Sequence, residues 1–124
     1  MAKTIATILG VVFLVIGLLG LFPNSIVGDG AYFHTDFWHN LVHLVTGLVF
    51  LLVVSRSPGK SASTLTILGI IYLLVITTIG FSVGEGNILG FIAVNSHDNW
   101  LHLVLGFGAF IAGLSTKGSS SQMM

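Results

Sequence analysis

Long apolar stretches separated by short polar segments form the main pattern of this chain. Four stretches approach the roughly 20 residues that an α-helix needs to cross a bilayer. They run over residues 4–22, 37–55, 62–81 and 97–115. Pro23 and Asn24 follow the first stretch, while Asp36 and Ser96 stand where they can cap the second and fourth helices. The pattern predicts an all-α membrane protein, a four-helix transmembrane bundle.

The composition agrees with this prediction and excludes several classes of function. Only 6% of the 124 residues are charged and 54% are apolar, whereas a water-soluble domain carries far more charge. The chain has no cysteine, which excludes disulfides, thiolate zinc sites and cysteine-ligated iron–sulfur clusters. The sequence has zero formal net charge and lacks phosphate loops, dinucleotide fingerprints and hydrolase motifs. We therefore expect a non-enzymatic protein without nucleic-acid or nucleotide partners, embedded in a lipid bilayer.

The cationic residues fall on one side of the predicted bundle. They lie on the two tails and the central connection: Lys3, Arg56, Lys60 and Lys117. Cytoplasmic loops are enriched in Lys and Arg, so both termini are predicted to be cytoplasmic. The first and third connections are then extracytoplasmic. Because these connections are half apolar, we expect them to lie along the interface or fold over the bundle.

The two halves of the chain repeat one another at a spacing of 59 residues. Residues 7–10 and 66–69 both read TILG, and Asn-x-x-His-Leu-Val-x-Gly occurs at 40–47 and again at 99–106. The sequence predicts two tandem helical hairpins, residues 1–59 and 60–117, followed by a disordered tail at 118–124. Since each hairpin crosses the bilayer twice, the two copies form a parallel internal repeat. The simpler alternative is two unrelated but similar apolar hairpins.

This repeat places His43 and His102 at matched depths, roughly 10 Å inside their helices. Ionisable side chains inside a membrane are costly and rarely face lipid, so they are candidates for a functional site. His39 and Asp98 lie four residues earlier, on the same helix faces as His43 and His102. We expect these four ligand-type side chains to converge near the centre of the bundle.

Two kinds of cofactor use such a group. A zinc, copper or iron ion takes imidazole and carboxylate ligands, here from all four side chains. Alternatively, His43 and His102 bind haem b or another tetrapyrrole such as chlorophyll. Gly47 and Gly106, four residues further along, would then leave room for a flat ring. For His34 and His97, near the helix starts, we expect only structural hydrogen bonds to a loop carbonyl or a partner helix.

A structural role is the competing prediction. Here the same histidines join helices in an accessory subunit or a self-assembling bundle with no cofactor. The glycine-containing apolar faces would suit a homo-oligomer or a larger membrane complex.

The paired segments Asn40 to Gly47 and Asn99 to Gly106, with the opening Thr-Ile-Ala-Thr-Ile-Leu-Gly, give the chain a family resemblance. From about Ala2 to Leu114 it resembles a family of small bacterial four-helix membrane proteins classed as a domain of unknown function (DUF4383). The resemblance implies a four-helix architecture and a bacterial inner, plasma or thylakoid-type membrane. It implies no activity, cofactor or site residues.

Overall fold

The computed structural model describes the backbone of residues 1–122 and the side chains of residues 1–116. Within this part of the chain, four helical segments are long and apolar enough to cross a membrane: Ala2–Leu19, Phe37–Arg56, Pro58–Val83 and Ser96–Thr116. The predicted four-helix membrane architecture is confirmed. The last helix is traced to Gln122, inside the segment 118–124 that was predicted to be a disordered tail. The side chains of that segment, and residues 123–124 entirely, lie outside the described residues.

The chain forms helices in the spans and short strands in the two outer connections. In order, the elements are α1 (Ala2–Leu19), β1 (Val27–Gly28), β2 (Phe33–His34), α2 (Phe37–Arg56), η1 (Pro58–Lys60), α3 (Ser61–Ile70), η2 (Ile71–Ile76), α4 (Thr77–Val83), β3 (Gly86–Ile88), β4 (Ile92–Val94) and α5 (Ser96–Gln122). The third span thus consists of η1, α3, η2 and α4 in succession.

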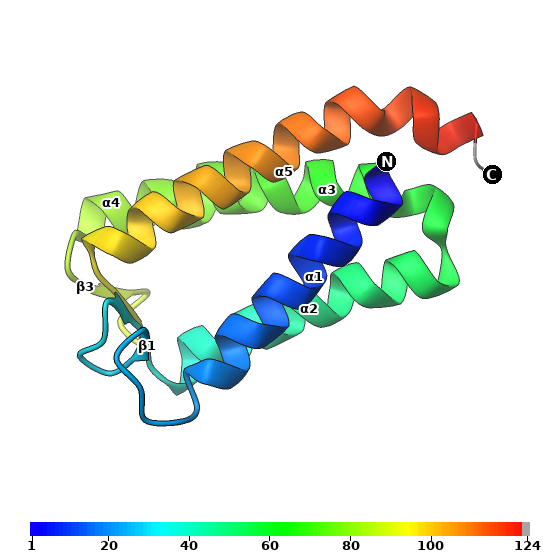
Figure 1. The fold of residues 1–124 in the computed structure, drawn as a ribbon. Helices are drawn as coiled ribbons and strands as arrows, with labels where there is room; N and C mark the ends of the chain where they lie inside the picture. Colours follow the sequence, from blue (N-terminus) through cyan, green and yellow to red (C-terminus); the bar gives the residue numbers. More distant parts are fainter. Residues whose placement is uncertain (123–124) are drawn as a thin grey trace.

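The helices pack as two pairs, α1 with α2 and α3 with α5 (Figure 1). The strands gather at one end of the bundle, while the N-terminus and the connection from α2 to α3 lie at the other (Figure 1). Between the pairs is an apolar core that includes Phe13, Phe50, Leu65 and Tyr72. The ring centroids of Phe13 and Tyr72 are 5.1 Å apart, so the core joins the two pairs.

Glycines allow close contact between the helices of each pair. A Cβ added at Gly47 in α2 would lie 2.7 Å from the carbonyl oxygen of Gly10 in α1, and one added at Gly106 in α5 would lie 2.7 Å from the backbone nitrogen of Leu73. Any side chain at either position would push the helices apart. Such small-residue contacts are the usual means of packing helices in membranes, where lipid provides no hydrophobic driving force.

The starts of α2 and α5 use different caps. The Asp36 carboxylate accepts the backbone N–H of His39 at 2.9 Å, so the predicted cap of α2 is confirmed. The predicted cap of α5 is wrong by one residue. Asn95 caps this helix, because its Oδ1 accepts the N–H of Asp98 at 3.0 Å and its own N–H donates to Asp98 Oδ2 at 2.9 Å. This reciprocal arrangement is a capping box, and Ser96 is the first helical residue.

The third connection folds back onto the bundle as the antiparallel β3–β4 hairpin. Gly86 pairs with Val94, and Ile88 pairs with Ile92. Ile88 and Val94 are buried, so one face of the hairpin covers the end of the bundle. The first connection forms the short parallel β1–β2 pair. We expected the outer connections to lie along the interface or fold over the bundle, and this hairpin folds over the bundle. Its strands were not predicted.

Within the third span, the stretch Ile71–Ile76 is a π-helix. The Thr77 hydroxyl donates to the carbonyl oxygen of Tyr72 at 2.7 Å, which satisfies an acceptor at this irregular turn. Isolated π turns inside α-helices are often found at functional sites. Here Tyr72 is buried and faces the interior of the bundle.

Candidate metal centre

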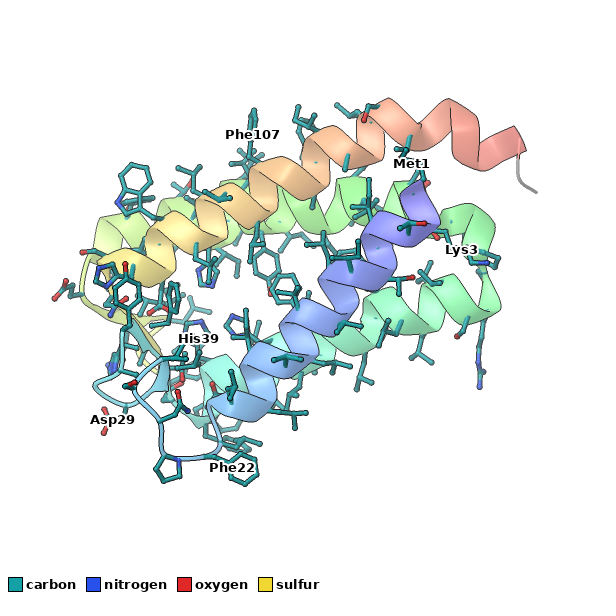
Figure 2. All side chains as sticks on the ribbon, viewed as in Figure 1. Met1, Lys3, Phe22, Asp29, His39 and Phe107 are labelled. Carbon is teal, nitrogen blue, oxygen red and sulfur yellow. The ribbon has the colours of Figure 1, made fainter. Side chains whose placement is uncertain are left out.

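Three histidines from two helices meet inside the bundle near its strand-bearing end, where Figure 2 labels His39. His39 and His43 belong to α2 and His102 to α5. Each is only 2% exposed, and one ring nitrogen from each lies within 4.8 Å of the others. The Nε2 atoms of His43 and His102 are 3.5 Å apart. The structure therefore brings together the two repeated histidines and the neighbour predicted one turn before His43.

A backbone contact selects the tautomer of His39. Its Nδ1 lies 2.5 Å from the carbonyl oxygen of Ala93 in β4. A carbonyl oxygen only accepts, so Nδ1 carries the hydrogen and donates it. In the neutral ring, Nε2 then has a free lone pair, and this buried atom has no hydrogen-bond partner among the described residues. An outer hydrogen bond of this kind is typical of metal-binding histidines.

The Ala93 backbone is held to α2 at both of its polar groups. Its N–H donates to Asp36 Oδ2 at 3.2 Å, and its carbonyl accepts from His39. The first of these bonds uses the same carboxylate that caps α2. The β3–β4 hairpin and the first turn of α2 therefore form one hydrogen-bonded unit that orients the His39 ring.

The rings of His43 and His102 meet edge to edge, and their Nδ1 atoms are buried without partners among the described residues. Two nitrogens bound to one tetrahedral zinc ion lie about 3.3 Å apart, given a metal–nitrogen bond of about 2.0 Å. The observed 3.5 Å between the Nε2 atoms is close to this spacing. Two facing lone pairs repel each other, so a shared cation or proton between them is the favourable arrangement.

Asp98 is 1% exposed but does not belong to this group. Its carboxylate is used in the capping box with Asn95 at the start of α5. Of the four predicted ligands, the structure gathers three histidines and leaves this carboxylate one turn away, bonded to the backbone. The resulting donor set is three neutral imidazoles.

A small cavity adjoins the three histidines. Its volume is about 20 Å³, and its remaining walls are Tyr72 and five aliphatic side chains: Val42, Ile76, Ile88, Ile92 and Val94. A cavity of roughly 10–15 Å³ by this measure holds one water molecule, so the space suits one small ligand or ion. A tetrapyrrole does not fit, because ring-sized ligands occupy pockets of about 300–1,000 Å³.

At Gly47 and Gly106, the glycines predicted to give a ring clearance, an added Cβ would meet atoms of the neighbouring helix. Both are in contact with the neighbouring helix of their own pair. Within the described residues, these two glycines serve helix packing. Of the two predicted cofactors, the local geometry therefore accommodates a metal ion and not a tetrapyrrole.

The model of the family described as "Domain of unknown function (DUF4383)" matches residues 3–115 of the chain. The chain belongs to this family. The match covers nearly all of the four spans and includes all three histidines of the centre. No curated protein and no solved structure matched this DUF4383 chain.

Two parts of this DUF4383 site were missed as site residues in the sequence. The Tyr72 hydroxyl lies 2.8 Å from Thr46 Oγ1, and Thr46 already donates its own hydrogen to the carbonyl of Val42. Tyr72 is therefore the donor in this contact between the helix pairs. As the only tyrosine inside a span, Tyr72 could have been recognised from the sequence as a candidate site residue. The other part, the Ala93 carbonyl, could not be recognised from the sequence, because every residue has a backbone carbonyl.

The remaining histidines, His34 and His97, contact the backbone of the first outer connection. The backbone N–H of Gly30 donates to His34 Nδ1 at 3.0 Å. The Nδ1 of His97 lies 3.1 Å from the carbonyl oxygen of Tyr32, and the two rings stack at 3.8 Å. His34 in β2 and His97 in the first turn of α5 thus have structural contacts outside the buried group.

Proposed function

We propose that this DUF4383 protein binds one transition-metal ion within the bilayer through His39, His43 and His102. The observation that carries the proposal is the convergence of three buried imidazoles, with ring nitrogens within 4.8 Å of one another. Imidazole suits zinc, copper and iron. Three neutral ligands add no charge, so singly charged copper(I) is buried at a lower desolvation cost than a divalent ion. Copper is therefore our first choice, and zinc is the second.

Metal binding would join the two halves of the bundle. Two ligands come from α2 and one from α5, and these helices belong to different pairs. The rings are held in place before any ion arrives: His39 bonds Ala93, and the centroids of the His43 and Phe13 rings are 5.7 Å apart. Preorganised ligands bind more tightly because little conformational freedom remains to be lost. The role is binding of the ion and not catalysis.

The proposal is tested by measuring metal uptake on protein purified in mild detergent. After exposure to copper(I) or zinc and removal of free ion, elemental analysis should find about one ion per chain. His43→Ala and His102→Ala should lose most of this metal, because each leaves only two imidazoles. Circular dichroism reports whether these variants remain helical.

Matched substitutions outside the group serve as controls. His34→Ala in β2 and His97→Ala in the first turn of α5 each remove an imidazole outside the group, and both variants should keep the metal. Asp98→Asn should keep it as well, since that carboxylate lies in the capping box. Folded protein that takes up no metal, or uptake that persists in the double variant of His43 and His102, would contradict the proposal and favour a cofactor-free structural role.

A further inference from the structure

We infer that the cavity beside the three histidines binds a small neutral diatomic molecule as an additional ligand of the metal. This inference rests on the proposed function and names the class of molecule that the centre receives. Carbon monoxide, nitric oxide and dioxygen share the required size and absence of charge. The argument depends on the number of protein ligands, the cavity volume and the lining of the cavity.

The protein supplies three ligands, which leaves a coordination position open. Structural zinc sites are closed by four protein ligands, whereas sites that bind an outside molecule keep a position free. Within the described part of the chain, the group that can hold an ion contains His39, His43 and His102 and no carboxylate. The nearby Asp98 is bonded to the Asn95 backbone. The open position therefore belongs to an added molecule.

The cavity provides the space for that molecule. All three histidines line it, and its volume is about 20 Å³, enough for roughly one molecule the size of water. Anything much larger than a diatomic would have to displace Val42 or Ile76, which also line it. The cavity thus limits the ligand by size.

The lining favours a neutral, weakly polar molecule over water or an anion. Five of the nine lining residues are valine or isoleucine. The only hydroxyl group among the nine lining residues is that of Tyr72, whose hydrogen goes to Thr46. A buried water needs two to four polar partners, and apolar cavities stay dry and take up apolar gases. A buried anion without hydrogen-bond donors is costlier still.

The route into the site also favours neutral molecules. The β3–β4 hairpin separates this cavity from a larger polar pocket of about 480 Å³ on the outer surface, and Val94 lines both spaces. Val94 is 1% exposed, so it blocks direct passage of ions from that pocket. A neutral diatomic dissolves in hydrocarbon, so it would approach the site through the bilayer. The hairpin thereby helps to select the ligand.

The test uses carbon monoxide as the probe and copper(I) as the metal. Full-length protein in lipid nanodiscs is loaded with copper(I) without oxygen, and elemental analysis measures the metal. On addition of carbon monoxide, the infrared spectrum should show a single C–O stretching band, saturating at about one molecule per copper. Azide, tested separately as an anionic probe, should bind more weakly than carbon monoxide.

A pair of substitutions on α2 locates the site. Val42→Phe fills the cavity and should weaken carbon monoxide binding by about tenfold or more, with copper retained. Val45→Phe makes the same change at a lipid-facing position that is 52% exposed, and it should bind like the parent. If Val42→Phe fails to fold or loses copper, Ile92→Phe fills the cavity from the hairpin instead.

The outcomes separate this inference from the proposed function. Copper bound through the histidines without carbon monoxide binding overturns the inference and leaves the metal site intact. Equal carbon monoxide binding in Val42→Phe and Val45→Phe, or a preference for azide, also overturns it. Failure to take up copper or zinc would end the proposed function, and this inference with it.

Discussion

At the residue scale, Asn99 shows how a polar side chain stabilises a helix end inside the bundle. Its Nδ2 donates to the carbonyl oxygens of Gly80 and Gly84, both at 3.0 Å, and the residue is 1% exposed. Asn99→Ala leaves these carbonyls without that donor, so the free energy of unfolding should fall by about 1–3 kcal/mol. The measurement is the unfolding transition in mixed detergent micelles titrated with a denaturing detergent.

Asn87 provides the control for this prediction. It is exposed in the outer hairpin, and Asn87→Ala should leave the unfolding transition within about 0.5 kcal/mol of the parent. An Asn99→Ala protein as stable as the parent would contradict the assigned role of the amide.

The same scale explains why three of the four side chains that were expected to converge do so, and the fourth does not. Depth and spacing were enough to select His43, His102 and His39. They could not separate His39 from Asp98, which stand at corresponding positions of the two helices. A carboxylate in the first turn can accept the N–H of its own cap residue, and Asp98 does so. An imidazole donates instead, and His39 donates to Ala93. That carbonyl comes from a distant hairpin, which local sequence does not reveal.

At the scale of elements, substitutions at two glycines distinguish the effect of helix packing on stability from the effect of helix propensity. A Cβ at Gly47 meets the Gly10 carbonyl oxygen at 2.7 Å, whereas one at Gly108 has no atom within 4 Å. Gly47→Ala should therefore lower the free energy of unfolding by about 1–3 kcal/mol through overpacking. Gly108→Ala should leave it unchanged or raise it by up to about 1 kcal/mol, because alanine is the better helix former.

Thermal unfolding followed by circular dichroism, in the same detergent for both variants, measures this difference. Equal stability of the two variants would contradict the assigned close contact of α1 and α2. Metal uptake should survive in Gly108→Ala, since that residue faces away from the histidines.

The helices were predictable at this scale, and the details within them were less so. Gly10 and Gly69, 59 residues apart, both contact the neighbouring helix of their pair closely. Gly20 after α1 and Gly80 after the π-helix each face the amide of an asparagine. These two glycines are 60 residues apart. A π turn holds one more residue than an α turn, which accounts for the shift. These spacings support the predicted repeat, which remains an inference.

The strands escaped prediction for a different reason. Each spans only two or three residues, too short for an alternating apolar pattern to stand out. The turn of the β3–β4 hairpin includes Leu89 at φ 55°, a conformation that leucine rarely adopts. Sequence indicated a partly apolar connection, and only tertiary packing reveals the hairpin.

At the scale of the whole molecule, the exterior is apolar and the interior contains the polar groups. Large apolar side chains are exposed along every span, among them Val45, Leu74, Val104 and Phe107, and Figure 2 shows Phe107 pointing away from the bundle. A lipid environment explains this surface, because hydrocarbon solvates it without cost. The same faces can also contact a second copy or a larger complex, which stays a prediction.

The distribution of charge along the bundle predicts its orientation. Lys3 lies at the end that holds the N-terminus, and Asp29 lies at the strand-bearing end (Figure 2). Arg56 and Lys60 flank the central connection, which shares the end of Lys3 (Figure 1). Because positive residues remain in the cytoplasm, the strands and the three buried histidines should lie toward the extracytoplasmic side.

Cysteine labelling tests this orientation cleanly, since the natural chain has no cysteine. In intact cells, a membrane-impermeant maleimide should label Asn87→Cys in the β3–β4 hairpin and should not label Ser57→Cys in the central connection. Both should react after the cells are permeabilised, which shows that each thiol is accessible. If only Ser57→Cys is labelled in intact cells, the protein has the opposite orientation to the predicted one. That orientation would place the three histidines toward the cytoplasm, so the proposed metal ion would have to be supplied from that side.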